Sequence, residues 1–323
     1  MTQRLPYRPQ PIGLGAWQLG GDWGDVSEDD ALDVLAAAVR SGVDFVDTAD
    51  VYGDGRSERL IGRFLREHPG TAVTVATKMG RRVEQVAANY TEANFRAWND
   101  RSRANLGLDT LDLVQLHSPP TEVYSDDAVY DALDRMVADG RIAAYGVSVE
   151  TTAQALTAMA RPNVASVQII LNCFRQKPLD EVLPAARAAG VAIIARVPLA
   201  SGLLSGKYDE HTTFAANDHR TFNRSGAAFD VGETFAGVPY EVGLAAVREL
   251  TPLVPAGATT AQFALRWILD QPGVTVVIPG ARNRGQAEGN AAAADLPTLT
   301  PDQLAGVRDV YDRLIRPHVH DRW

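Results

Sequence analysis

Short apolar runs, many of them rich in β-branched residues, recur along the chain, and each is followed by a stretch whose apolar positions have helical spacing. Most of the runs are continuously apolar and do not alternate with polar residues, which is typical of parallel strands covered by helices. The runs that predict strands are residues 13–17, 43–47, 72–78, 111–117, 142–148, 165–171, 191–197 and 274–280.

The segments between these runs predict helices, and several have the expected signals at their ends. Ser27 is a good N-cap and Gly42 a good stop for the first helix, and Thr300 precedes an additional helix near the end of the chain. The other helices are predicted near residues 58–68, from 91, 126–138, from 152, 179–190, 241–251, 259–271 and from 284.

Eight strand–helix repeats predict a closed (β/α)₈ TIM barrel, with residues 1–323 forming a single domain. We expect an N-terminal hairpin, a long loop after the seventh strand and an extra C-terminal helix. The alternative is an open doubly wound sheet, but its GxGxxG fingerprint is missing, because Gly13-Leu14-Gly15 is followed by Ala-Trp-Gln. The connection 202–239 is too long for an ordinary strand-to-helix turn and is interpreted as a lid on the substrate side.

Composition and charge narrow the function classes. The 323 residues carry a net charge of −9, so a nucleic-acid-binding role has no electrostatic footprint, and the short basic pair Arg81-Arg82 is interpreted as solvated surface. No apolar run approaches the roughly 18 residues that span a bilayer, and MTQRLPYRPQP lacks the apolar core of a signal peptide. A single cysteine, Cys173, fits a reducing compartment. We therefore expect a cytoplasmic protein without nucleic-acid or membrane partners, and its oligomeric state is open.

Ionisable side chains end consecutive predicted strands, and in a barrel of this class the active site lies at that end. The second strand ends with Asp47, and its loop contains Asp50 and Tyr52; the third strand ends with Lys78 and the fourth with His117. Charged or proton-carrying groups on three neighbouring strands predict a site for proton transfer. Later strand ends add Ser148, Gln168, Asn172 and Arg196.

These groups can form a proton-donating set. A phenol such as Tyr52 keeps its proton near pH 7, since its reference pKa is about 10, and a neighbouring lysine cation favours the phenolate and makes the phenol a better acid. An ion pair with Asp47 would keep a buried Lys78 protonated. His117 can donate a hydrogen bond that fixes a substrate oxygen.

A metal site is the competing interpretation, because Asp47, Asp50 and His117 could supply ligands. The sequence has no HExxH spacing, and His219, His318 and His320 lie in the long loop or near the end of the chain. A lysine directed at the same place would also repel a cation. We therefore expect no metal, and we interpret Asp50 as a residue that caps its loop.

Seven stretches carry a combined signal that covers nearly the whole chain: GLGAWQLGG (13–21), DFVDTADVYGDGRSERLIG (44–62), VATK (75–78), LDLVQLH (111–117), YGVS (145–148), PLASGLLSGKY (198–208) and VIPGARNRGQAEGN (277–290). In combination and in this order, these motifs resemble those of the aldo-keto reductases. The resemblance implies a (β/α)₈ barrel that binds a nicotinamide cofactor without a Rossmann fingerprint.

By this resemblance Asp47, Tyr52, Lys78 and His117 form a catalytic tetrad. Tyr52 would be the general acid in carbonyl reduction and the base in the reverse direction. Lys78, paired with Asp47, would tune it, and His117 would orient the carbonyl. The hydride would come from the nicotinamide. The implied activity is the NAD(P)H-dependent reduction of aldehyde, ketone or sugar-like carbonyls.

The resemblance also implies cofactor contacts. Ser148 and Gln168 match positions that meet the nicotinamide carboxamide, but the usual Asn after that serine is Val149 here. Arg196 stands where many members stack an aromatic ring, which indicates a branch of the family with arginine there. Arg282 is the expected partner of the 2′-phosphate, so NADPH is favoured over NADH. The full set is Gly15, Ala16, Trp17, Ser148, Gln168, Arg196, Val197, Pro198, Leu199, Ser201, Gly202, Leu204, Gly206, Lys207, Ile278, Gly280, Arg282, Gln286 and Asn290.

Two other functions stay open at this point. One is a cofactor-binding regulatory subunit of the same fold that serves a partner protein, and the other is a metal-dependent barrel hydrolase or isomerase. The sequence does not name the substrate. We expect the pocket walls to come from loops 17–26, 81–90, 119–125 and 202–239, with Trp23 and either Phe222 or Phe229 as candidate apolar residues.

Overall fold

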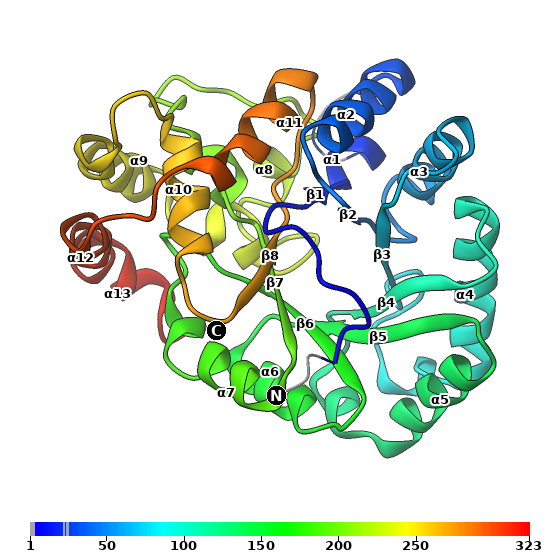
Figure 1. The fold of residues 1–323 in the computed structure, drawn as a ribbon. Coiled ribbons are helices and arrows are strands. Elements are labelled where there is room, and N and C mark those ends of the chain that lie inside the picture. The colour runs from blue at the N-terminus through cyan, green and yellow to red at the C-terminus, as the bar shows by residue number, and fades with distance from the viewer. Residues whose placement is uncertain (1–3, 22, 24–25) are drawn as a thin grey trace.

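Eight parallel strands follow one another around a barrel in the structure, a computed structural model that describes residues 4–21, 23 and 26–323 (Figure 1). Each strand is hydrogen-bonded to the next along the chain. The predicted (β/α)₈ architecture is therefore confirmed. The strands are β1 (Leu14–Gly15), β2 (Phe45–Asp47), β3 (Thr74–Met79), β4 (Leu111–His117), β5 (Ile142–Ser148), β6 (Val164–Ile170), β7 (Ala192–Arg196) and β8 (Val274–Val277).

The segment before the first strand closes the barrel. A parallel bridge joins Ile12 to Val277 of β8, and the Val277 N–H donates to the carbonyl of Pro11 at 2.9 Å. The N–H of Gly13 returns a hydrogen bond to the Val277 carbonyl at 2.8 Å. The expected N-terminal hairpin is wrong for the described residues 4–21, because this segment pairs with the last strand and does not fold back on itself.

Helices lie outside the strands and connect them (Figure 1). Among the described residues, no helix is both long and apolar enough to cross a membrane. The α-helices are α1 (Trp17–Gly20), α2 (Glu28–Arg40), α3 (Arg56–Glu67), α4 (Glu92–Leu106), α5 (Asp127–Ala138), α6 (Thr152–Met159), α7 (Val182–Ala189), α8 (His219–Phe222), α9 (Tyr240–Leu250), α10 (Thr260–Leu269), α11 (Arg284–Ala291), α12 (Pro301–Val310) and α13 (Arg316–Val319).

The helix ends follow the local signals in the sequence. Ser27 accepts a hydrogen bond from the N–H of Asp30 at the start of α2, and Gly42 has a φ of 90° just after its end, a conformation that costs glycine little. Thr300 caps α12, so the predicted C-terminal helix is confirmed. Helix α3 begins two residues before the predicted start, at Arg56.

The long segment after β7 is folded against the mouth of the barrel. It contains α8 and several short 3₁₀ turns, among them η4 (Ala200–Ser205), η5 (Val231–Glu233) and η6 (Phe235–Gly237). An antiparallel bridge joins Asp218 to Trp23, and Asp230 accepts a hydrogen bond from Trp323 Nε1 at 3.0 Å. The segment therefore lies between the first strand loop and the end of the chain.

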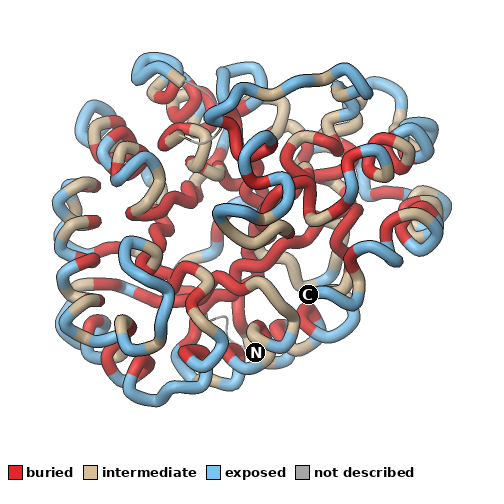
Figure 2. Tube along the Cα trace, turned by 180° about the vertical axis from the view of Figure 1, so that it is seen from behind, coloured by how far each residue is buried: buried red, intermediate tan, exposed pale blue. Residues whose placement is uncertain are grey.

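The interior of the barrel is apolar at one level and polar at the next. The buried shell in Figure 2 comprises the strands and the inner faces of the helices. Inside the barrel, Leu5 packs with strand residues such as Phe45, Ala76 and Leu113. Side chains alternate between the two faces of a strand, so the residue two positions after each of these apolar strand residues also points into the barrel interior. On β2, β3 and β4 these residues are Asp47, Lys78 and Gln115.

The contact between α3 and α4 depends on Gly62. A Cβ at this position would lie 2.6 Å from the backbone oxygens of Asn105 and Leu106, which cannot move aside easily. Gly62→Ala should therefore lower the free energy of unfolding by about 1–3 kcal/mol in urea denaturation. Gly289→Ala is the matched control, because an added Cβ there meets nothing within 4 Å. It should be neutral or stabilise by up to about 1 kcal/mol, and equal losses in both variants would contradict the close contact.

Candidate active site

The barrel brings the four candidate catalytic residues together at the carboxyl ends of three neighbouring strands. Asp47 ends β2, Lys78 lies one residue before the end of β3, and His117 ends β4. Tyr52 lies in the turn between β2 and α3. Gly53, with a φ of 57°, lets the chain turn directly after Tyr52 toward the helix.

Lys78 connects the members of this group. Its Nζ lies 2.5 Å from Oδ1 of Asp47, 2.9 Å from the carbonyl of Thr48 and 3.1 Å from Oη of Tyr52. Only 1% of the Lys78 side chain is exposed. Burial would lower the pKa of Lys78, but the charges and hydrogen bonds of Asp47 and Tyr52 outweigh burial and raise the pKa. The ammonium therefore stays charged, as the sequence led us to expect.

Tyr52 is held between aromatic rings. The ring of Trp17 stacks on it at 6.0 Å between centroids, and His117 meets it edge-on at 5.9 Å. Burial raises the pKa of Tyr52, and Lys78 offsets only part of that rise. The sequence predicted the effect of the lysine but not the larger effect of burial. The phenol therefore keeps its proton at neutral pH beside a cation that can stabilise its conjugate base.

His117 is a neutral imidazole in this setting. Burial lowers the pKa of His117 well below its ordinary value, and the cations Arg81, Lys78 and Arg196 lower it further. Its Nδ1 has no hydrogen-bond partner among the described residues. A neutral imidazole has one N–H donor and one acceptor, so His117 can hydrogen-bond to a substrate oxygen without carrying charge.

Four charged side chains form a second group beside the first, which we call the Arg/Glu cluster: Arg196 and Glu233 are buried, and Arg81 and Glu150 are partly buried. Arg196 lies 2.8 Å from Glu150, and Arg81 lies 3.2 Å from Glu233 and 3.4 Å from Glu150. Arg81 also donates to the carbonyl of His117 at 3.0 Å. The interpretation of Arg81 as solvated surface is wrong, because carboxylates from two distant loops bind its guanidinium.

The two carboxylates of the Arg/Glu cluster differ in proton affinity. Burial would raise the pKa of Glu150, but Arg196 and Arg81 hold it down at about 2. Burial raises the pKa of Glu233, and the arginines offset this only in part. Since Glu233 belongs to η5, its contacts with Arg81 and Arg196 attach the long segment to the barrel mouth.

Asp50 is buried without side-chain partners. Neither carboxylate oxygen has a hydrogen-bond partner among the described residues, so the interpretation of this side chain as a loop cap is wrong. Its backbone makes the contacts, since its N–H donates to the carbonyl of Lys78 and its carbonyl accepts from Arg82 and Arg101. Burial, with a smaller contribution from Glu58, raises the pKa of Asp50 to about 7.

The described residues contain no group of three or more His, Cys, Asp or Glu side chains arranged to hold a metal ion. Lys78 stands where a cation bound by Asp47 would have to lie, and its Nζ already neutralises that carboxylate at 2.5 Å. The neighbour of the Asp47 carboxylate in this structure is therefore an ammonium, which also contacts the Tyr52 hydroxyl.

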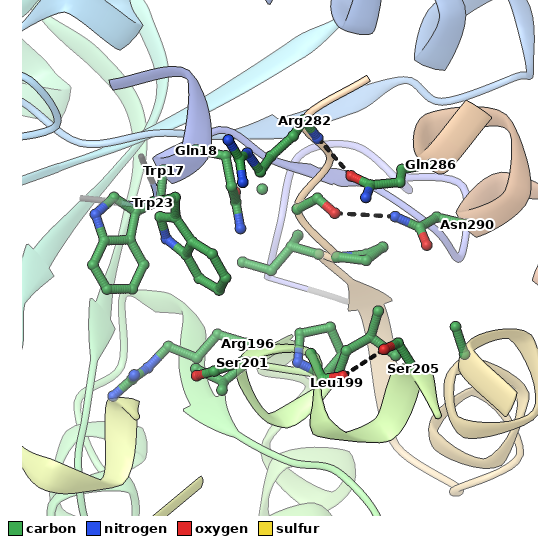
Figure 3. A pocket seen from close by; sticks show the side chains of 18 of the residues that line it. Trp17, Gln18, Trp23, Arg196, Leu199, Ser201, Ser205, Arg282, Gln286 and Asn290 are labelled. Atoms are coloured by element: carbon green, nitrogen blue, oxygen red, sulfur yellow. Dashed lines mark hydrogen bonds between the residues drawn. The ribbon is translucent and has the colours of Figure 1, made fainter. Parts of the chain in front are cut away.

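A cavity of about 770 Å³ opens at this end of the barrel. This volume is in the range of sites that bind cofactors and other small molecules. Figure 3 shows Trp23 and Arg196 toward one end of the cavity and Gln286 and Asn290 toward the other. Asp47, Tyr52 and His117 line it, and Lys78 lies behind them.

Most residues that were expected to contact a cofactor line this cavity. Ala16 and Leu204 do not, because they are fully buried in the core, and Gly206 is the left-handed residue that ends η4. Those that line the cavity are Gly15, Trp17, Ser148, Gln168, Arg196, Val197, Pro198, Leu199, Ser201, Gly202, Lys207, Ile278, Gly280, Arg282, Gln286 and Asn290.

The far end of the cavity is built on the start of α11. Asn283 caps this helix by accepting from the N–H of Gln286 at 3.0 Å, and the Gln286 side chain accepts from the N–H of Arg282 at 2.8 Å. Asn290 donates to the carbonyl of Gly280 at 3.2 Å. These contacts fix the loop that carries Arg282, and a helix start beside an arginine is favourable for a phosphate.

Several wall residues differ from the expectation. Trp23 lines the cavity, and Phe229 meets the ring of Trp17 at 5.7 Å, whereas Phe222 is largely at the surface. None of the described residues of loops 81–90 and 119–125 lines the cavity, so that expectation is wrong. Arg81 turns into the Arg/Glu cluster instead, and residues 121–125 form a 3₁₀ turn, η2 (Thr121–Ser125). In the expected loop 17–26, residues 22, 24 and 25 lie outside the described residues.

The sequence did not single out several cavity residues. Thr259, Ala261 and Gln262, at the start of α10, lie outside every loop that was expected to line the pocket, whereas Gln18, Arg220 and Glu233 lie in expected loops but were not named individually. Gln18 packs on Gly280. A Cβ at residue 280 would lie 2.1 Å from the side-chain amide of Gln18, and Oε1 of Gln18 has no partner among the described residues. Arg220 and Glu233 come from the long segment. Gln18 lies within a recognised stretch, so its region was indicated, but no periodic signal places single residues of an irregular segment.

The barrel, the lysine-paired phenol and the adjoining cavity define a barrel oxidoreductase. The chain belongs to the aldo/keto reductase family, whose sequence model matches residues 11–312. It is 31% identical over 283 residues to the aldo-keto reductase YhdN of Bacillus subtilis, a match that covers 86% of this chain and 82% of the relative.

Solved structures agree with this assignment. The glycerol dehydrogenase AKR11B4 from Gluconobacter oxydans superposes with a TM-score of 0.79 at 30% identity, covering 99% of this chain and 95% of that one. An aldo-keto reductase from Klebsiella pneumoniae, solved in complex with NADPH, has the same fold, with a TM-score of 0.69 at 23% identity and coverage of 93% and 90%.

Asp50 should make stability depend on pH. Its pKa in the folded protein is about 7, above its ordinary value of 3.8, so the folded state binds the extra proton and stability falls as pH rises from about 4 to 7. Asp50→Asn removes this penalty and should stabilise the protein by about 2 kcal/mol at pH 8, with little gain at pH 4. Urea denaturation at both pH values measures the difference. The same gain at both would contradict the raised pKa.

Proposed function

We propose that this protein reduces aldehyde and ketone carbonyls, sugar-like ones included, to alcohols with hydride from NADPH. The observation that carries the proposal is the position of the Tyr52 hydroxyl. It lies 3.1 Å from the Lys78 ammonium, and Tyr52 itself lines the cavity. A carbonyl oxygen gains negative charge as hydride adds to its carbon, and a phenol beside a cation can protonate it.

The proposed proton transfer uses the four tetrad residues in different ways. Tyr52 gives its proton to the carbonyl oxygen, and Lys78 stabilises the phenolate that remains. Asp47 keeps Lys78 in place through its 2.5 Å contact, and neutral His117 positions the oxygen by a hydrogen bond. When bound, the dihydronicotinamide supplies the hydride. In alcohol oxidation the Tyr52 phenolate takes the proton back.

Unsatisfied polar atoms in the cavity wall support a dinucleotide as the cofactor. Nε of Arg196 and Oε1 of Gln18 are buried without partners among the described residues. Gln168 and Ser148, near the tetrad, would hold the nicotinamide carboxamide, and the stretch from Val197 to Lys207 would hold the pyrophosphate. The contributing loops come from almost all of the barrel, which supports treating the chain as one catalytic domain.

Arg282 supports NADPH over NADH. Its loop is fixed by the cap of α11, and its guanidinium has the fork geometry that binds phosphate. The amide groups of Gln286 and Asn290 lie beside it and would meet the adenosine end (Figure 3).

A direct assay tests the activity. With NADPH and a nitrobenzaldehyde, the protein should consume NADPH, and Tyr52→Phe should lower kcat by about 100- to 10,000-fold with little change in the dissociation constant of NADPH. Lys78→Met should act similarly, and the two losses should not multiply in the double variant. Tyr7→Phe is the matched control, since the Tyr7 hydroxyl is buried without a partner among the described residues and lies away from the cavity.

The outcomes separate the three functions. Near-normal turnover of Tyr52→Phe would refute Tyr52 as the acid. Tight NADPH binding without turnover of any carbonyl in a broad panel would favour a regulatory subunit. Activity that EDTA abolishes and divalent metal restores would favour metal chemistry.

Cofactor preference is tested at Arg282. Arg282→Ala should weaken NADPH binding about tenfold or more and leave NADH binding nearly unchanged, since only NADPH has the 2′-phosphate that the guanidinium would pair with. Arg284→Ala is the control, because Arg284 pairs with Glu288 at the surface. Dissociation constants from fluorescence titration measure both. An equal loss for NADPH and NADH in Arg282→Ala would contradict the role.

A further inference from the structure

The second carboxylate oxygen of Asp47 is held by two buried amides. Oδ1 of Asp47 binds Lys78, while Oδ2 accepts hydrogen bonds from Nε2 of Gln168 at 2.7 Å and from Nε2 of Gln115 at 3.2 Å. Gln115 is fully buried on β4, and Gln168 is 1% exposed on β6. Gln168 also lines the cavity, whereas Gln115 does not. Gln115 is not one of the four tetrad residues, so the proposed proton transfer does not explain why an amide is buried at this position.

The chemistry of a carboxylate fixes the orientation of both amides. A carboxylate only accepts hydrogen bonds, so the nitrogen of each amide must face Asp47. Gln168 Nε2 also lies 3.4 Å from Oε1 of Gln115, which gives its second N–H an acceptor. Gln115 thus donates to Asp47 and accepts from Gln168. The Oε1 of Gln168 is left as the part of that amide available to the cavity.

The position of Gln115 follows from the barrel register. Lys78 pairs with Gln115 between β3 and β4, and Leu113 is the interior residue one level below. At the lower level the interior is filled by apolar side chains, whereas at the level of Lys78 the register places the amide of Gln115 beside Asp47. An amide there is therefore explained by what it contacts, which is the carboxylate that binds Lys78.

We propose that Gln115 is a positioning residue of the proton-donating group, which it serves by holding Oδ2 of Asp47 and the amide of Gln168. Through these contacts it sets how much of the Lys78 charge is available to Tyr52. The proposal rests on the proposed function, in which Tyr52 is the acid. Hydrogen bonds to a charged group are stronger than neutral ones, so losing one changes how the carboxylate shares its ammonium partner.

Removing the amide of Gln115 has a definite expected direction. With one donor fewer, the Asp47 carboxylate binds the Lys78 ammonium more strongly, and less positive charge remains to stabilise the Tyr52 phenolate. The pKa of Tyr52 then rises. The other charged and titratable groups that act on Tyr52 stay in place: His117, Glu233, Arg81 and Arg196.

The first test compares Gln115→Met with the natural protein in alcohol oxidation as a function of pH. Methionine matches the length of glutamine and has no N–H donor. The pH of half-maximal kcat should rise by about half a pH unit or more. Losing the hydrogen bond changes the charge that Asp47 and Lys78 present to Tyr52, and this change raises the pKa of the phenol. The KM for the alcohol should be unchanged, because Gln115 does not line the cavity. Leu113→Val, one level lower on the same strand, should leave the pH profile in place.

The second test needs no cofactor and no turnover. In protein labelled with ¹³Cζ-tyrosine, the Tyr52 resonance can be assigned by its absence in Tyr52→Phe. It should shift in Gln115→Met and not in Leu113→Val. Gln115→Asn keeps the amide one methylene too short to reach Asp47, so it should behave like Gln115→Met, and it serves if the methionine variant does not fold.

The two proposals fail in different ways. A folded Gln115→Met protein with an unchanged pH profile and an unchanged Tyr52 resonance would overturn the role of Gln115. If the natural protein turns over no carbonyl or alcohol, the proposed function fails. The resonance of Tyr52 would in that case still decide whether Gln115 acts on the tyrosine.

Discussion

The buried ion pair between Lys78 and Asp47 is the interaction on which the rest of the site depends. Taking two charges out of water is costly unless every remaining donor and acceptor is satisfied, and removing one partner of such a pair typically costs about 3–5 kcal/mol. Here the lysine also contacts the carbonyl of Thr48 and the Tyr52 hydroxyl, and the carboxylate also binds Gln115 and Gln168. The ammonium and the carboxylate of this pair are thus satisfied by their neighbours, and in the proposed function the Tyr52 phenol is the group that exchanges a proton.

The loops at the barrel mouth are joined by a second set of charges. The Arg/Glu cluster connects the loop after β3, the loop after β5, the end of β7 and the long segment. Its Arg81 also contacts the backbone of His117. The positive charges of Arg81 and Arg196 favour the neutral imidazole, so the cluster influences the tetrad electrostatically as well as holding the cavity wall together.

The fold could be predicted because its repeats are local. A continuously apolar run followed by helical spacing has the same meaning wherever it occurs, and caps such as Ser27 and Thr300 mark the helix ends. The expected hairpin failed because residues 11–13 pair with β8, a partner more than 250 residues away. No local pattern reports such a pairing.

The tetrad could be located because strand ends in a barrel converge, so residues far apart in sequence were expected in one place. The environment of each residue could not be read in the same way. Asp50 looked like a polar loop residue and is buried without side-chain partners among the described residues, and Arg81 looked solvated and is held by two carboxylates. No signal singled out Gln115 within LDLVQLH or Glu233 within the long segment, because their contacts are made only in the folded chain.

The pH dependence of kcat in both directions, with one carbonyl–alcohol pair, tests the central claim most directly. If Tyr52 is the acid in reduction and the base in oxidation, reduction should decline and oxidation should rise through a shared apparent pKa. In Lys78→Met, the decline of reduction and the rise of oxidation should both move to higher pH, because the cation that stabilises the phenolate is gone. Profiles that change in the same direction, or that Lys78→Met leaves in place, would contradict the account.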